Sequence, residues 1–213
     1  MRFFNKYFFS VYLISVLSTL NSQEYNLNSP IDLPINLSGT FGEFRSSHFH
    51  YGLDITTNKK PGYKIYSIDS GSIIRIRVST SGYGKAIYID HSNGLTSVYA
   101  HLKEFSPKIQ EYIKRQQYLN KSYSIQKFFN VGDFVINKGE LIGYSGNTGG
   151  SSGPHLHFEI RDTKSQNPIN PLSFKYKYID DKRPIIKSLY VFDENDRFAN
   201  NIPKRYSKKK KND

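Results

Sequence analysis

Short hydrophobic runs of period two fill much of residues 39–100 and restrict the possible fold most strongly. In "YKIYSIDSGSIIRIRVSTSGYGKAIYIDHSNGLTSVYAHL", Ile, Val and Tyr alternate with polar residues, and the runs end at "DSG", "SGYG" and "HSNG". This alternation is typical of strands with one buried face, and such short turns join antiparallel neighbours. We therefore predict a meander of antiparallel strands and a mainly β fold.

A single helical pattern interrupts the predicted strands at residues 106–119, "SPKIQEYIKRQQYL". Ser106 suits the N-cap, Pro107 suits the first helical position, and Ile109 and Ile113 recur at helical spacing. We predict one amphipathic helix here, and we expect it to flank any groove formed by the sheet.

Two histidines lie one residue apart in "SGPHLHFEI", directly after a glycine-rich segment that we expect to be a loop. Residues i and i+2 of a strand point to the same face and lie about 7 Å apart. His155, His157 and Glu159 should therefore share one face of a strand around residues 155–160. Paired imidazoles of this kind make a metal or catalytic site as plausible as a packed or surface histidine.

A second candidate segment is "HFHYGLDI", where Asp54 follows His50 by four residues. On a straight strand their side chains would lie about 13 Å apart, so we expect a local turn at Gly52 to bring them together. His48 is a competing ligand, although it lacks an aspartate and a glycine at useful offsets.

The remaining histidines give weaker signals. His101 ends an apolar run in "VYAHLKEF" and would by itself be interpreted as a structural residue. His91, in the turn "DHSNG", is interpreted as exposed. Taken together, His50, Asp54 and His157 would supply two nitrogens and one oxygen and leave a fourth position open, which is the ligand pattern of catalytic zinc.

The chain contains no cysteine, which excludes disulfides and thiolate metal sites. Residues 1–22 place Arg2 and Lys6 before an apolar block too short for a comfortable membrane span, so we predict a secretory signal cleaved near Ser22. An uncleaved anchor is the alternative. We expect an extracytoplasmic protein, in the periplasm or secreted, with no stable membrane span after cleavage.

The formal net charge of +12 would fall by two units on loss of the signal. An exported basic chain favours anionic envelope polymers or lipid headgroups, and we expect no nucleic-acid partner. The terminal "KRYSKKKKND" is interpreted mainly as a disordered, solvated end.

Three separated motifs, "HYGLD", "YAHL" and "HLHFE", occur in order, with "FGEFR" upstream. In these motifs the chain resembles the lysostaphin-type murein metallopeptidases, the LytM-like domain. The resemblance implies one Zn²⁺ per chain on His50, Asp54 and His157, with His101 and His155 as the catalytic pair. It also implies a compact antiparallel β-sheet domain, a duplicated hybrid motif, with an open groove and, in this chain, one inserted helix.

The implied activity is zinc-dependent hydrolysis of peptide bonds in peptidoglycan crosslinks or stems, in cell-wall remodelling. A histidine would act as the base, because the chain has no HExxH glutamate. Glu159 would either fix a histidine tautomer or be a surface carboxylate. The alternative function is a non-catalytic domain that binds peptidoglycan or activates another hydrolase, and a regulatory envelope partner is a further possibility.

The predicted organisation has four parts. They are a signal peptide (1–22), an N-terminal extension (23–38), the metallopeptidase domain (39–175, with a helical insertion at about 103–130) and a C-terminal extension with the basic tail (176–213).

Overall fold

The computed structural model describes residues 25–45, 48–179, 186, 188–191 and 204–207. The predicted signal peptide and the end of the basic tail lie outside these residues. The described residues fall into two compact units, one ending at Ile179 and one formed by the residues after it.

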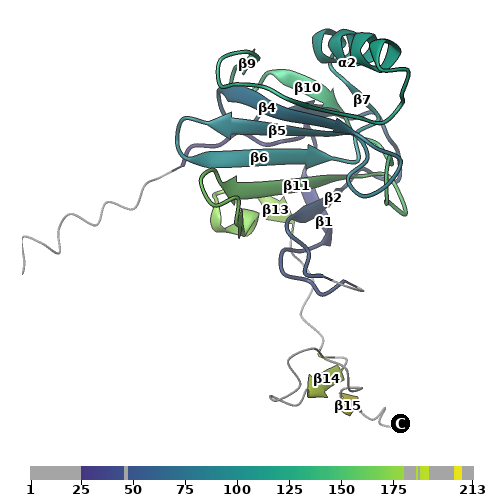
Figure 1. The fold of residues 1–213 in the computed structure, drawn as a ribbon. Coiled ribbons are helices and arrows are strands. Elements are labelled where there is room, and N and C mark those ends of the chain that lie inside the picture. Colours follow the sequence, from purple (N-terminus) through teal and green to yellow (C-terminus); the bar gives the residue numbers. More distant parts are fainter. Residues whose placement is uncertain (1–24, 46–47, 180–185, 187, 192–203, 208–213) are drawn as a thin grey trace, which may run out of the picture. The chain divides into compact units, whose positions relative to one another are not determined.

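The first unit is built on a ten-stranded sheet with the order β13-β1-β2-β11-β6-β5-β4-β8, with β12 beside β11 and β9 beside β4. Figure 1 shows β4, β5, β6 and β11 side by side across its middle. Its strand pairs are antiparallel, apart from the parallel pair of β1 with β13. The strands of this sheet are β1 (Ile35–Gly39), β2 (Leu53–Thr56), β4 (Gly71–Val78), β5 (Ala86–His91), β6 (Leu95–Ala100), β8 (Ile125–Phe128), β9 (Val135–Ile136), β11 (His155–Asp162), β12 (Pro168–Ile169) and β13 (Tyr178–Ile179).

The predicted meander is confirmed, because β4, β5 and β6 follow one another in the chain and pair in that order. The turn between β5 and β6 needs its glycine, since Gly94 has a φ of 81° and its N–H donates to the His91 carbonyl at 3.2 Å. The mainly β fold class is confirmed as well.

A smaller three-stranded sheet has the order β3-β10-β7, with β3 at Lys64–Tyr66, β10 at Leu141–Tyr144 and β7 at Glu104–Phe105. The helix α2 (Pro107–Leu119) follows β7 directly, and Figure 1 shows it near β7 and β10. A short 3₁₀ helix, η1, spans Pro171–Ser173.

The predicted helix is confirmed, and it buries Ile109 and Ile113 against the core. The predicted position of its N-cap, Ser106, is confirmed, although the Ser106 side chain makes no capping hydrogen bond. Instead, the side chain of Gln110 reaches back and accepts a hydrogen bond from the Phe105 N–H at 3.2 Å.

The core of the first unit consists mainly of isoleucines and aromatic residues from both sheets. On β11, Leu156, Phe158 and Ile160 are at most 1% exposed and belong to this core. Burying a side chain of this size contributes about 1.5–3 kcal/mol. Ile31 and Ile35, from the segment predicted as an N-terminal extension, are also core residues, so part of that segment belongs to the folded unit.

The second unit contains a two-stranded antiparallel sheet of β14 (Ser188–Val191) and β15 (Lys204–Ser207). The first four residues of the basic tail therefore pair as a strand, and their interpretation as a disordered end is wrong. None of the helices among the described residues has the length and hydrophobicity to cross a membrane.

Candidate metal centre

Strand pairing brings Asp54 and His157 together. In the β2–β11 ladder they are direct partners, and His157 also lies opposite Ala100 of β6. His50 lies three residues before β2 and reaches the same point. Their exposed fractions are 6% for His50, 9% for Asp54 and 4% for His157, so the cluster is buried.

Gly52 allows the short path from His50 into β2, although not by the turn geometry that the sequence suggested. Its φ is not in the left-handed region. A Cβ at position 52 would instead lie 2.3 Å from the carbonyl oxygen of Phe158, so only glycine lets this backbone approach β11.

Three side-chain atoms of this cluster meet at one point. His50 Nε2 lies 3.0 Å from His157 Nδ1 and 3.1 Å from Asp54 Oδ1, and His157 Nδ1 lies 3.0 Å from Asp54 Oδ1. These three residues are the group whose potential ligand atoms all lie within 4.8 Å of one another. A tetrahedral zinc with bonds of 2.0–2.1 Å would hold its ligands about 3.3 Å apart, so the spacing fits this metal.

The outer nitrogens of the two rings fix which atoms face this point. His50 Nδ1 lies 2.8 Å from the Thr40 carbonyl, which only accepts, so Nδ1–H donates and Nε2 is left for a metal. His157 Nε2–H likewise donates to Glu159 Oε1 at 2.8 Å, which leaves His157 Nδ1. The donor set therefore fits zinc in chemistry as well as in spacing.

The other two histidines of the motifs face the same cavity. His101 Nδ1–H donates to the Thr148 carbonyl at 2.8 Å, and His155 Nδ1–H donates to the Gly153 carbonyl at 2.8 Å. Their Nε2 atoms are thus the free ones, and that of His155 lies 3.4 Å from Asp54 Oδ1. The ring centroids of His101 and His155 are 4.8 Å apart, so the two imidazoles form a pair. His101 also has a φ of 57°, a strained conformation of the kind found at functional sites.

Glu159 is not a surface carboxylate, because it is fully buried. Besides His157, it accepts hydrogen bonds from the Tyr83 hydroxyl and from Arg161, whose Nε lies 2.7 Å from Glu159 Oε2. Burial would raise the pKa of Glu159, but His157 and Arg161 outweigh it and hold the pKa below its usual range. An ionised carboxylate therefore fixes the orientation of His157.

The pKa values of the histidines and of the aspartate at this cavity depend on one another and on burial. Burial opposes the charge of Asp54, yet the surrounding imidazoles of His155, His157 and His50 hold its pKa well below the usual range. Burial alone would lower the pKa of His157, but Asp54 and Glu159 raise it to about 9. For His101, burial outweighs its bond to Thr148 and, with the nearby histidines, lowers the pKa to about 4, so this imidazole is neutral at pH 7.

Arg45, the last residue of "FGEFR", is a site residue for which the sequence predicted no role. Its Nη2 lies 2.8 Å from Asp54 Oδ2 and 3.2 Å from Glu43 Oε2. Arg45 therefore holds the outer oxygen of Asp54 and leaves Oδ1 to face the histidines. The feature of the sequence that could have revealed this role is a basic residue five positions before His50.

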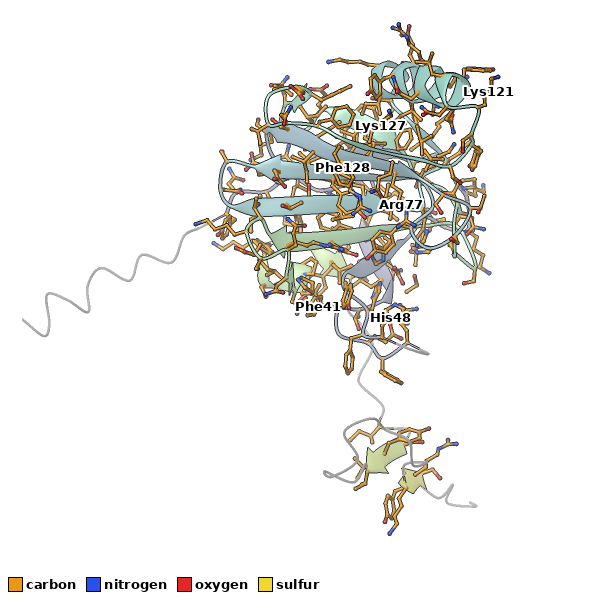
Figure 2. All side chains as sticks on the ribbon, in the orientation of Figure 1. Phe41, His48, Arg77, Lys121, Lys127 and Phe128 are labelled. Atoms are coloured by element: carbon orange, nitrogen blue, oxygen red, sulfur yellow. The ribbon has the colours of Figure 1, made fainter. Side chains whose placement is uncertain are left out.

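His48 and His91 lie outside the three-residue cluster. His48, on the loop between β1 and β2 (Figure 2), lines the cavity but does not join the ligand group. His91 was predicted to be exposed, and this is wrong. It is 5% exposed, with Nδ1 3.0 Å from the Ser70 carbonyl and Nε2 2.8 Å from Ser97 Oγ.

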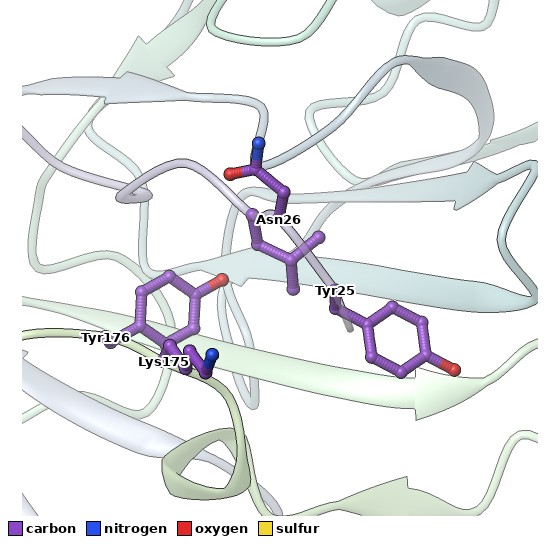
Figure 3. Close-up of a pocket in the computed structure, with 5 residues that line it drawn as sticks. Tyr25, Asn26, Lys175 and Tyr176 are labelled. Carbon is purple, nitrogen blue, oxygen red and sulfur yellow. The ribbon is translucent and has the colours of Figure 1, made fainter. Parts of the chain in front are cut away.

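The four histidines of the site line one cavity of about 620 Å³ together with Asp54, Arg45, Lys59, Tyr83 and the Gly150–Pro154 segment. No residue of α2 is among its lining residues, so the helix does not flank the cavity directly. A second hollow of about 390 Å³, shown in Figure 3, is lined by Tyr25–Leu27, Lys175 and Tyr176. It contains no histidine or carboxylate, so it lacks the donors of a metal centre.

Comparison with protein families identifies the chain. A model of peptidase family M23 matches residues 48–131 and 123–171, which together cover more than half of the sequence. The matched region includes His50, Asp54, His101, His155 and His157. The chain belongs to peptidase family M23. This membership confirms the resemblance to the lysostaphin-type metallopeptidases.

Two curated relatives illustrate the similarity. The chain is 34% identical over 101 residues to the DD-carboxypeptidase/endopeptidase Mpg of Neisseria meningitidis, covering 47% of this chain and 17% of that protein. It is 30% identical over 140 residues to lysostaphin of Staphylococcus simulans, covering 65% of this chain and 22% of that protein. The matched region thus spans less than a quarter of either relative.

Among solved structures, the fold is similar to that of a zinc-containing peptidase from Vibrio cholerae. The TM-score is 0.51 with 22% identity, and the match covers 73% of this chain and 41% of that one. At this identity the similarity shows the shared fold.

Proposed function

We propose that this chain is an exported zinc metallo-endopeptidase that hydrolyses peptide bonds in peptidoglycan crosslinks or stems. The observation that carries the proposal is the convergence of His50 Nε2, Asp54 Oδ1 and His157 Nδ1 beside a second imidazole pair, in a member of peptidase family M23. A non-catalytic member would not need His101 and His155 at this cavity.

The geometry of the side chains supports the proposed ligand roles. His50, Asp54 and His157 would hold one Zn²⁺, with Glu159 and Arg45 fixing the orientation of His157 and Asp54. Bound zinc would supply Lewis-acid chemistry, polarising a peptide carbonyl and lowering the pKa of water to about 7.

His101 and His155 are the proposed catalytic pair. Because each donates its Nδ1–H to a backbone carbonyl, each presents Nε2 to the cavity. His101, neutral at pH 7, would orient a water molecule and accept its proton at Nε2. The neighbouring His155 would stabilise the charge that develops on the carbonyl oxygen of the substrate.

Peptidoglycan is the proposed substrate because of the relatives. The two curated relatives are named DD-carboxypeptidase/endopeptidase and lysostaphin. The matched region of this chain contains all five proposed site residues, His50, Asp54, His101, His155 and His157. The net positive charge, which stays positive after loss of the predicted signal, also favours an anionic wall polymer. An extracytoplasmic location, in the periplasm or outside the cell, follows from the predicted signal peptide and from this substrate.

The test is incubation of the purified chain with intact peptidoglycan, with and without a chelator, followed by mass analysis of the released fragments. We expect chelator-sensitive release of fragments with new amine ends inside crosslinks or stems. Release of whole stems would indicate an amidase instead. Binding to peptidoglycan without any released fragment, from a zinc-replete preparation, would favour the non-catalytic alternative.

A further inference from the structure

The turn that follows β2 holds a lysine in a strained conformation at the edge of the cavity. In Thr57–Lys60, the Lys60 N–H donates to the Thr57 carbonyl at 2.8 Å, and the two central residues have positive φ values, 51° for Asn58 and 59° for Lys59. Positive φ at both central positions is the pattern of a type I′ turn, in which Asn followed by Gly is strongly preferred. Asn58 fits this preference, whereas Lys59 stands where glycine would be unstrained.

Lys59 is also the cationic side chain of the cavity that has no partner of opposite charge among the described residues. It lines the same cavity of about 620 Å³ as the histidines. Arg45, the other Lys or Arg there, is paired with Asp54 and Glu43. Among the residues that the structure describes, none forms an ion pair or hydrogen bond with the Lys59 side chain, which is exposed. Strain that persists beside a catalytic cavity points to a use for the side chain.

The charges of the cavity indicate the chemistry of the missing partner. Asp54 is the one carboxylate among the lining residues, and it is already shared by Arg45 and the histidines. With a divalent metal bound, cationic charge would exceed anionic charge in this cavity, so an anionic group of a ligand would be attracted to Lys59.

From the strained turn and the unmatched charge we infer that Lys59 is a specificity-determining residue that binds a carboxylate of the peptide substrate at the edge of the cavity. This inference rests on the proposed peptidase function and adds the class of substrate: peptides with a free carboxylate near the bond that is cleaved. The carboxylate could be the C-terminus of the peptide or a side-chain group, and the two sources call for separate arms of the test.

The probe is a synthetic stem peptide, L-Ala–γ-D-Glu–L-Lys–D-Ala–D-Ala, in three forms. One has both carboxyl groups free, one has only the C-terminal carboxyl amidated, and one has only the glutamate carboxyl amidated. Binding to the zinc-loaded full-length chain is measured by calorimetry, within a time too short for turnover. Cleavage is measured separately. Binding does not require hydrolysis, so failure of the peptidase proposal would appear as binding without cleavage.

The informative variant is Lys59→Gly, because it changes stability and binding in opposite directions. Relief of the left-handed strain should raise the melting temperature by about 2–4 °C. Loss of a partly exposed ion pair should weaken binding of the free-acid peptide about three- to fivefold. One amidated form should already bind the wild type this weakly and be insensitive to Lys59→Gly, and that form identifies the carboxylate.

Two control variants of the same turn separate the causes. Lys60→Ala removes a neighbouring positive charge without touching a cavity residue, and Asn58→Gly relieves strain without changing charge. Both should bind the free-acid peptide like the wild type. Equal affinity of the wild type for all three peptides, or unchanged free-acid binding by Lys59→Gly, would overturn the inference. A loss in Lys60→Ala as large as that in Lys59→Gly would also overturn it, since it would reveal general surface charge.

Discussion

The two faces of strand β11 differ completely in chemistry, although alternate residues of one eight-residue strand supply both. Leu156, Phe158 and Ile160 face the apolar core, where the Phe158 ring lies 5.5 Å from that of Tyr99. His157 and Glu159 face the metal centre and are equally buried, at 4% and 0% exposed.

The difference teaches how two kinds of burial are stabilised. The core face is stabilised by the apolar area removed from water. A substitution there lowers the free energy of unfolding in proportion to the volume lost. The polar face is stable only because each inward group has a partner: His157 contacts Asp54 and Glu159, and Glu159 contacts Arg161. Substitutions on the polar face should therefore change metal binding and chemistry, whereas substitutions on the core face should change the free energy of unfolding.

The largest effect is expected for Asp54→Ala, which removes a ligand and the negative charge that two imidazoles cannot replace. The zinc content should fall from one per chain to near zero, and peptidoglycan hydrolysis should fall to background. Elemental analysis and fragment release on the same preparation measure both. Asp162→Ala, at the half-buried C-terminal end of β11, is the control and should keep its zinc. Full zinc occupancy in Asp54→Ala would contradict the ligand assignment.

The next effect separates the two paired histidines. His157→Ala should lose zinc and activity, whereas His155→Ala should keep zinc and lose about 10²–10⁴-fold in rate, as for a general acid or base. His101→Ala should behave like His155→Ala, and the double variant should lose less than the two single effects combined, because the pair acts as a unit. A zinc-free His155→Ala beside a zinc-replete His157→Ala would show that the roles are reversed.

On the core face, Phe158→Ala should lower the free energy of unfolding by about 3–5 kcal/mol, because it leaves a cavity beside Tyr99. Denaturant titration of the metal-free protein measures this loss. The folded fraction should still bind one zinc per chain. Loss of zinc from a fully folded Phe158→Ala protein would show that the two faces are not energetically separate.

A smaller effect is expected for Glu159→Gln, which keeps the shape of the side chain but removes its charge. Without the carboxylate, His157 is less basic and less firmly oriented, so zinc affinity should fall about 10–100-fold. Competition with a chromophoric chelator measures the affinity. An unchanged affinity would mean that Glu159 only fills space.

The smallest effect concerns His91, a buried histidine remote from the ligand group. Burial lowers its pKa, so between this pKa and about 6.5 the unfolded chain binds more protons than the folded one, and stability falls as the pH falls. The difference in free energy of unfolding between wild type and His91→Gln should therefore be smaller at pH 5 than at pH 7. Urea titrations at both pH values measure it, and a difference that grows at pH 5 would contradict this sign.

Much of the local structure could be predicted from the sequence, because it depends on periodicity. Period two in the segment from β4 to β6 predicts the meander. The same alternation along a later strand predicts that His155, His157 and Glu159 share a face. The helical spacing of Ile109 and Ile113 predicts α2 to within one residue. The roles of the five histidine and aspartate residues in metal binding and catalysis stay predictions, although the structure brings all five to one cavity.

Tertiary structure alone decided the features that depend on distant partners. Gly52 is needed because the carbonyl of Phe158 lies against it, and His91 is buried because the carbonyl of Ser70 and the hydroxyl of Ser97 satisfy its ring. Arg45 has its role because its guanidinium meets Asp54 across the loop. Sequence periodicity reports which face of an element is apolar, whereas hydrogen bonds and close approaches between segments depend on distances that arise only when the strands pair.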